Sequence, residues 1–339
     1  MSKKECKQDC VMKKTSIGGQ ALIEGVMMRG PQKTAMAVRH TSGEIRMEEF
    51  DNPVSKCGWI KKVPLVRGLF GMIDSLRFGY KCLMRSAELS GLEEELEEAL
   101  EEEQAKKKDA ASDEDAAPAE EKKDNKKKAG LLMGVVMVIG TVLGIGLSLV
   151  LFMWLPIQLF RWLTIPFPGL DNPYVRGVFE GLVRILIFLG YMLAVSRMKD
   201  IRRTFQYHGA EHKSIFCYEK GLPLTVENVR MQKRFHPRCG TSFLVLMLVV
   251  GIIISILIPI SHPVWRTVVK LALLPLTVGV GYELIKLAGR YDNWFTRAIS
   301  APGVWMQHIT TIEPDDDMIE CAIKALEAVI PEDPEADQW

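Results

Sequence analysis

The sequence predicts a mainly α-helical, polytopic membrane protein with about four transmembrane helices and a small N-terminal cytoplasmic β region. Hydrophobic residues make up 48% of the 339 residues, and they gather in long uncharged runs. A run of about 20 apolar residues is enough to cross a bilayer as a helix. Near the N-terminus, the stretch TAMAVRHTSGEIRMEEF instead gives two short runs around a Thr-Ser-Gly turn, a pattern typical of a β-hairpin.

The chain before the first apolar run divides into three regions. Residues 1–62 hold the predicted strands, and the segment SIGGQALIEGVMMRGP within them predicts a tight loop or short strand, because its glycines permit close turns. Residues 63–92 predict an amphipathic helix that lies on the membrane or on the helix bundle. Its charged side chains share one stripe: Arg67, Asp74, Arg77 and Lys81. Residues 93–128 are almost all charged or small and predict a disordered linker.

Four apolar segments are predicted to cross the membrane: residues 129–160, 177–196, 241–260 and 266–288. The first has no ionisable residue. The second carries Glu180 and Arg184 one helical turn apart, and we expect them to pair, either as a structural ion pair or in a transport role. The fourth spans only if Lys270 and Lys286 extend toward opposite interfaces and Glu283 is satisfied internally.

Loop charge predicts the orientation. Residues 197–240 contain ten Lys and Arg residues, and such residues accumulate on the cytoplasmic side. We therefore expect a multi-pass plasma-membrane protein with both termini in the cytoplasm, including residues 289–339, where a helix is expected over 305–330. The seven cysteines fall on that reducing side, so structural disulfides are not expected. The net charge of +1 decides nothing about nucleic acid, but the basic residues concentrate beside the membrane, where anionic lipid explains them. The expected partner is therefore the lipid bilayer and not nucleic acid.

The cytoplasmic loop contains the candidate chemistry. In QYHGAEHKSIF, a helix over 206–220 would place His208, His212 and Glu219 on one face. The His-x-x-Glu-His order matches an inverted zincin pattern, in which the glutamate, here Glu211, acts as general base on water. A helix capped by Thr225 and ending near residue 233 is expected to follow.

The segment FHPRCGTS adds His236 and Cys239 as further metal ligands. Imidazole and thiolate both suit zinc, so a divalent metal, zinc, is the expected cofactor. Glu283 would lie at a similar depth and serve as an oxygen ligand or a partner of one. Two other interpretations stay open. The histidines could pair with lipid phosphate or with acids such as Glu219, or Cys239 could be a catalytic thiol assisted by a histidine.

Three separated segments, GGQALIEGVMMRGP, YHGAEHKSIFCYE and FHPRCGTSFL, resemble the domain of unknown function 1385 family, the YqhQ-like bacterial membrane proteins. The resemblance covers nearly the whole chain outside the acidic linker and the two ends. It implies a membrane architecture and the family's description as predicted metal-dependent enzymes, with no mechanism to transfer. The positions that match are Glu24, Arg29, His208, Glu211, His212, His236, Arg238 and Cys239.

These observations favour a metal-dependent hydrolase that acts on a membrane-associated substrate. The alternative is a non-enzymatic membrane scaffold or transport-related protein whose His/Cys loop is structural. A structural zinc site is closed by four protein ligands, whereas a catalytic site keeps an open position beside a base. The sequence does not indicate the oligomeric state.

Overall fold

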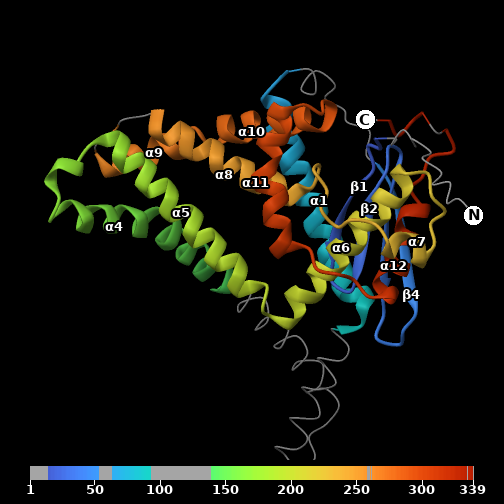
Figure 1. Ribbon diagram of the computed structural model, residues 1–339. Coiled ribbons are helices and arrows are strands. Elements are labelled where there is room, and N and C mark those ends of the chain that lie inside the picture. Colours follow the sequence, from blue (N-terminus) through green and yellow to red (C-terminus); the bar gives the residue numbers. More distant parts are fainter. Residues whose placement is uncertain are drawn as a thin grey trace, which may run out of the picture. The chain divides into compact units, whose positions relative to one another are not determined.

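A computed structural model describes residues 14–52, 63–92, 139–257, 260, 262–333 and 335–338. The described chain is mainly helical with one small antiparallel sheet near the N-terminus, as predicted (Figure 1). It divides into two compact units. Unit 1 comprises Met1–Glu93, Tyr191–Ile254 and Leu271–Trp339, and unit 2 comprises Glu94–Gly190 and Ser255–Lys270. The predicted linker over 93–128 and the start of the predicted span over 129–160 lie outside the described residues.

The sheet of unit 1 has four strands in the order β1-β2-β3-β4, each antiparallel to the next. Its strands are β1 Gly18–Leu22, β2 Gly25–Arg29, β3 Lys33–Arg39 and β4 Ile45–Asp51. The hairpin predicted over TAMAVRHTSGEIRMEEF forms β3 and β4. The glycine-rich segment before it forms β1 and β2, joined by a two-residue turn in which Glu24 has a φ of 52°.

Helices cover both faces of the sheet in unit 1. Successive side chains of a strand point to opposite faces, so each strand can contribute to a core on either side. On one face Val26, Met28 and Ala35 pack against α6 (Lys199–Glu219) and α12 (Asp316–Glu327). On the other face Met27 and Met36 join Cys82 of α1 (Val66–Ser90) in a smaller core. Helix α6, which carries the two histidines of the loop, therefore packs directly on one face of the sheet.

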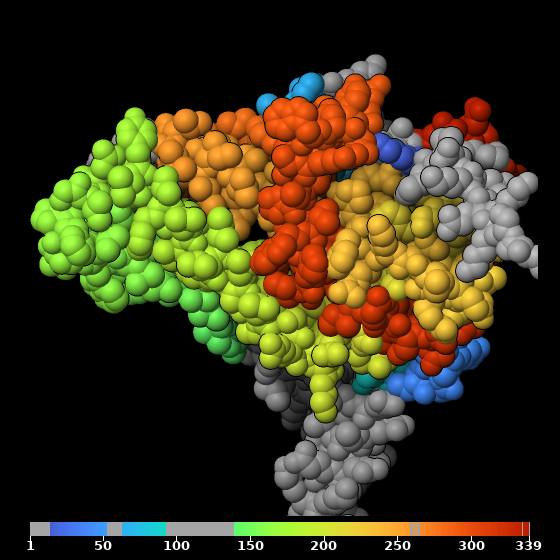
Figure 2. All heavy atoms as spheres, viewed as in Figure 1, coloured from blue at the N-terminus to red at the C-terminus, as the bar shows by residue number. Residues whose placement is uncertain are grey.

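The loop after α6 folds back over it. The predicted cap is confirmed: Thr225 accepts a hydrogen bond from the Asn228 backbone at the start of α7 (Val226–Arg230). In Figure 2 the atoms of α7 and α12 cover this face of unit 1, so that little of the sheet is visible. The chain then enters α8 (Gly240–Leu257) directly after Cys239.

Two predicted helices are interrupted in the structure. The single helix expected over 266–288 is divided at Leu273 into α9 (Pro263–Ala272) and α10 (Leu274–Arg290), where Pro275 removes a backbone donor from the first turn of α10. The helix expected over 305–330 is likewise two helices, α11 (Trp294–Thr310) and α12, since Pro314 and the N-cap Asp315 start α12 anew.

Among the described residues, three helices are long and apolar enough to cross a membrane: Ile139–Thr164, Pro173–Val195 and Gly240–Leu257. The pair α9 and α10 would make a fourth if it is one broken span. In unit 2 the first of these helices contains a π-helical turn, η2 (Val150–Trp154), which continues into α4 (Leu155–Thr164). A short 3-10 turn, η3 (Pro168–Leu170), precedes α5 (Pro173–Val195).

Candidate metal centre

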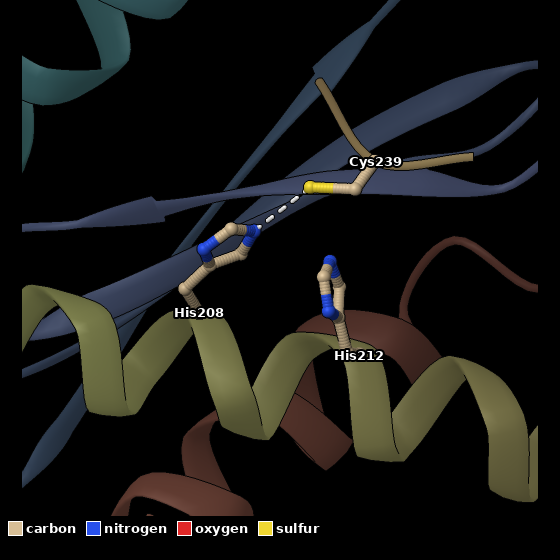
Figure 3. A group of neighbouring side chains, drawn as sticks. All are labelled: His208, His212 and Cys239. Carbon is tan, nitrogen blue, oxygen red and sulfur yellow. Dashed lines mark hydrogen bonds between the residues drawn. The ribbon is translucent and has the colours of Figure 1, made fainter. Parts of the chain in front are cut away.

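Three of the predicted ligands meet in unit 1. His208 and His212 lie one turn apart on α6, and Cys239 approaches from the end of the loop, as Figure 3 shows. One ligand atom from each residue lies within 4.8 Å of the other two. His208 Nε2 and Cys239 Sγ are 3.1 Å apart. The helical spacing inferred from the sequence is the reason that both rings face the same point.

Backbone carbonyls orient both imidazole rings. His208 Nδ1 lies 2.8 Å from the carbonyl oxygen of Thr310, and His212 Nδ1 lies 2.5 Å from that of Arg234. A carbonyl only accepts hydrogen bonds, so each Nδ1 carries the hydrogen and each Nε2 presents a lone pair when the ring is neutral. His212 Nε2 is buried and has no hydrogen-bond partner. A metal-ligating histidine usually has this arrangement, with its second nitrogen held by a carbonyl or carboxylate.

Cys239 is buried, and its sulfur accepts a hydrogen bond from the backbone of Thr241 at 3.4 Å. Burial raises the pKa of the thiol, but the neighbouring His208 and His212 rings lower that pKa well below its ordinary value. For His208, burial lowers the pKa of the ring, while Cys239 and Glu211 raise it to about 9. The site therefore favours the thiolate, the form of cysteine that binds metal.

Glu211 lies beside the three ligands without joining them. Its Oε2 is 4.0 Å from His208 Nε2, and the side chain is buried. Burial raises the pKa of its carboxyl group. A methyl group added to Gly19 of β1 would come within 2.8 Å of Glu211 Cγ, so the glycine is what allows the strand and this glutamate to approach.

His236 and Glu219, the other two predicted ligands, form a separate cluster with Arg238. Glu219 accepts hydrogen bonds from Arg238 and from the backbone of Thr15, and its Oε2 is 3.7 Å from His236 Nε2. Burial raises the pKa of the Glu219 carboxyl, but His236 and Arg238 lower it below its ordinary value overall. Burial lowers the pKa of the His236 ring. The ring centroids of His212 and His236 are 5.6 Å apart, so the two clusters are neighbours.

Glu283 lies outside the site. It accepts two hydrogen bonds from Arg67 of α1, one from Nε at 2.7 Å, and is not part of the group of possible ligands formed by His208, His212 and Cys239. Glu24 accepts hydrogen bonds at 2.5 Å from Arg203 in the first half of α6, so it fixes the β1-β2 turn on that helix. Arg29 lies over the ring of Phe78, 5.7 Å from its centre.

The residues of the site that the sequence did not predict are those that act through their backbone. Thr310 and Arg234 orient the histidines with carbonyl oxygens, and every residue type has a carbonyl, so neither gave a signal. Gly19 did give one, because a glycine pair in a strand often marks a close approach of another segment. The glycines alone could not predict that the approaching segment is α6.

The donor set suits zinc. Two imidazole nitrogens and a thiolate are ligands that zinc prefers, and three protein ligands are typical of catalytic zinc sites, which keep a further position open. The fully buried and unpartnered Nε2 of His212 is the observation that fits such an ion best.

Comparisons with known proteins identify the family of the chain. Residues 63–332 match the family described as protein of unknown function DUF1385. The chain is 34% identical over 318 residues to the uncharacterized protein YqhQ of Bacillus subtilis (strain 168), and the match covers 92% of each chain. No solved structure matches. The family match over residues 63–332, together with the 34% identity to this relative, establishes that the chain belongs to the DUF1385 family.

Proposed function

We propose that this chain is an integral membrane protein that binds a zinc ion near the cytoplasmic face and hydrolyses a membrane-associated substrate. The three or four apolar helices support the membrane location. The ten basic residues of 197–240 support the placement of the site on the cytoplasmic side. The site is formed by that loop, so a substrate held in or on the bilayer would be close to it.

One observation carries the metal proposal: His212 Nε2 is buried with no hydrogen-bond partner, beside His208 Nε2 and the Cys239 sulfur. Leaving a buried polar atom without a partner costs about 1–3 kcal/mol, which a metal ion would offset. His208, His212 and Cys239 would hold the ion. When bound, zinc supplies a Lewis acid that acidifies water and polarises a carbonyl or phosphoryl oxygen.

Glu211 would act as the general base. Its carboxylate lies next to the ligands but is a neighbour of His208 and not bonded to it. Burial raises the pKa of its carboxyl group toward the working range of a base at neutral pH. The carboxylate would accept a proton from the attacking water and later deliver it to the leaving group.

The metal content of the purified protein tests the site. We expect about one zinc per chain in the parent and almost none in a His208→Ala/His212→Ala double variant. A His262→Ala/His308→Ala double variant is the matched control, because it removes two histidines outside the cluster. Equal zinc in the parent and in the site variant would defeat the proposal.

Glu211→Gln separates a catalytic from a structural site. We expect this variant to keep its zinc and to lose about 10²–10⁴-fold in the rate of hydrolysis of chromogenic ester or phosphoester amphiphiles in micelles. If it loses zinc as completely as Cys239→Ser does, Glu211 is a fourth ligand and the site is structural. The non-enzymatic scaffold would then be the better interpretation.

A second candidate rests on the 3.1 Å contact between His208 Nε2 and Cys239 Sγ, the geometry of a thiolate nucleophile and its histidine. In that case Cys239 would react rapidly with iodoacetamide whether or not zinc is added. Zinc that protects Cys239 from alkylation supports the metal centre instead. Cys217, which donates to the Pro223 carbonyl, is the control thiol.

A further inference from the structure

Unit 2 contains a second cluster of buried charges that the proposed hydrolase does not use. Glu180 of α5 is fully buried and accepts hydrogen bonds from three cations. Arg266 Nη1 donates to its Oε1 at 2.8 Å, and Arg184 Nη2 and Lys270 Nζ donate to its Oε2 at 3.2 and 3.3 Å. The pair of Glu180 and Arg184 expected from the sequence is thus half of a larger group.

The cluster has more positive than negative charge. One carboxylate faces three cations, which leaves two positive charges without a counter-charge. The only other acidic side chain in the described part of unit 2, Asp171, is engaged with Arg176 at 2.7 Å. Uncompensated charge is costly in apolar surroundings, and intramembrane ionisable groups are usually functional. The described residues therefore lack an anion that the cluster requires.

Two further features point to a ligand. Arg266 is only 5% exposed, and its Nε is buried without a hydrogen-bond partner. The Nε of Arg184 donates at 2.9 Å to the carbonyl of Phe152, which the π-helical turn η2 makes available. π-Helical turns occur frequently at functional sites, because they free backbone groups from the helix. Glu180 and this carbonyl thus orient two guanidinium groups.

We propose that this cluster binds the dianionic phosphate group of a lipid phosphomonoester. Guanidinium groups match phosphate in geometry, and a phosphomonoester has a charge of about −1.5 to −2 at pH 7, which balances the two excess positive charges of the cluster. Both helices also carry exposed apolar side chains that are available to acyl chains: Leu182 of α5 at 56%, and Trp265 and Val268 of α9 at 64% and 47%. The site does not depend on the metal centre.

Native mass spectrometry of the full chain in detergent tests the proposal. We expect phosphatidic acid to bind more tightly than phosphatidylcholine with the same acyl chains. Lys270→Gln and Arg266→Gln should each weaken phosphatidic acid binding about tenfold, the effect of one charge-assisted hydrogen bond. Arg161→Gln, which removes an exposed basic side chain of α4, should leave it unchanged.

Inorganic phosphate is the second arm of the experiment. If it competes with phosphatidic acid at equal concentration, the phosphate site stands and a soluble phosphate is its ligand. Equal binding of phosphatidic acid and phosphatidylcholine by the parent overturns the proposal. An unchanged affinity in Lys270→Gln overturns it as well, because this side chain is the most exposed of the three cations and its loss should not prevent folding.

Discussion

Substituting alanine at Gly19 tests the contact between the N-terminal sheet and Glu211. The new methyl group would lie 2.8 Å from Glu211 Cγ and 2.8 Å from the Met27 carbonyl oxygen. Ordinary contacts between such atoms are about 3.5–4.0 Å, so either the strand or the glutamate must move by nearly 1 Å. Overpacking of this kind costs about 1–3 kcal/mol.

The neighbouring Gly18 is the matched control. A methyl group there meets nothing within 4 Å, and neither glycine has a positive φ. Gly18→Ala should therefore be neutral or stabilise by about 0.4–1 kcal/mol through the unfolded chain. We expect the two variants to differ by several degrees in melting temperature, measured by tryptophan fluorescence of the protein in detergent. Equal melting temperatures would refute the packing argument.

The same variant reports on the site. The three ligand atoms come from α6 and from Cys239, so Gly19→Ala should retain zinc. Its hydrolytic rate should fall, because Glu211 is displaced from the position beside His208. A variant that loses its zinc while remaining folded would show that β1 supports the ligands themselves.

Two other predictions concern the surroundings of the site. Because His236 and Arg238 together hold the pKa of Glu219 below its ordinary value, these contacts should stabilise the protein at neutral pH, and the stabilisation should disappear as the pH falls below about 4.3. Glu219→Gln should therefore flatten the acid limb of stability against pH, and an unchanged limb would contradict this. Gly303→Ala should cost about 1–3 kcal/mol, since its methyl group would lie 2.5 Å from Ser242 Cα, while Gly190→Ala meets nothing and should be neutral in thermal unfolding.

The features that follow from local pattern were predictable. Apolar runs located the candidate spans, and the one-turn spacing of His208 and His212 placed both rings on one face of α6. Cys239 was identified by its residue type, since thiolate and imidazole share a preference for zinc. The turn signal around residue 42 also located β3 and β4.

Features that depend on long-range packing were not predictable. His236 and Cys239 are three residues apart, but the loop turns one toward Glu219 and the other toward His208, and spacing alone cannot decide this in irregular backbone. Glu283 was placed near the loop by depth, yet α1 packs on α10 and gives it Arg67 as a partner. The two counter-charges of Glu180 beyond Arg184 come from α9, which lies about 90 residues away in sequence.

X-ray absorption at the zinc edge of the purified parent protein is the most direct test of the metal centre. We expect one sulfur ligand at about 2.3 Å and two imidazole nitrogens at about 2.0–2.1 Å, with the remaining position filled by a light atom. Cys239→Ser should remove the sulfur contribution, and Cys217→Ser should leave it intact. A shell without sulfur, or one with no imidazole scattering, would contradict a centre formed by His208, His212 and Cys239.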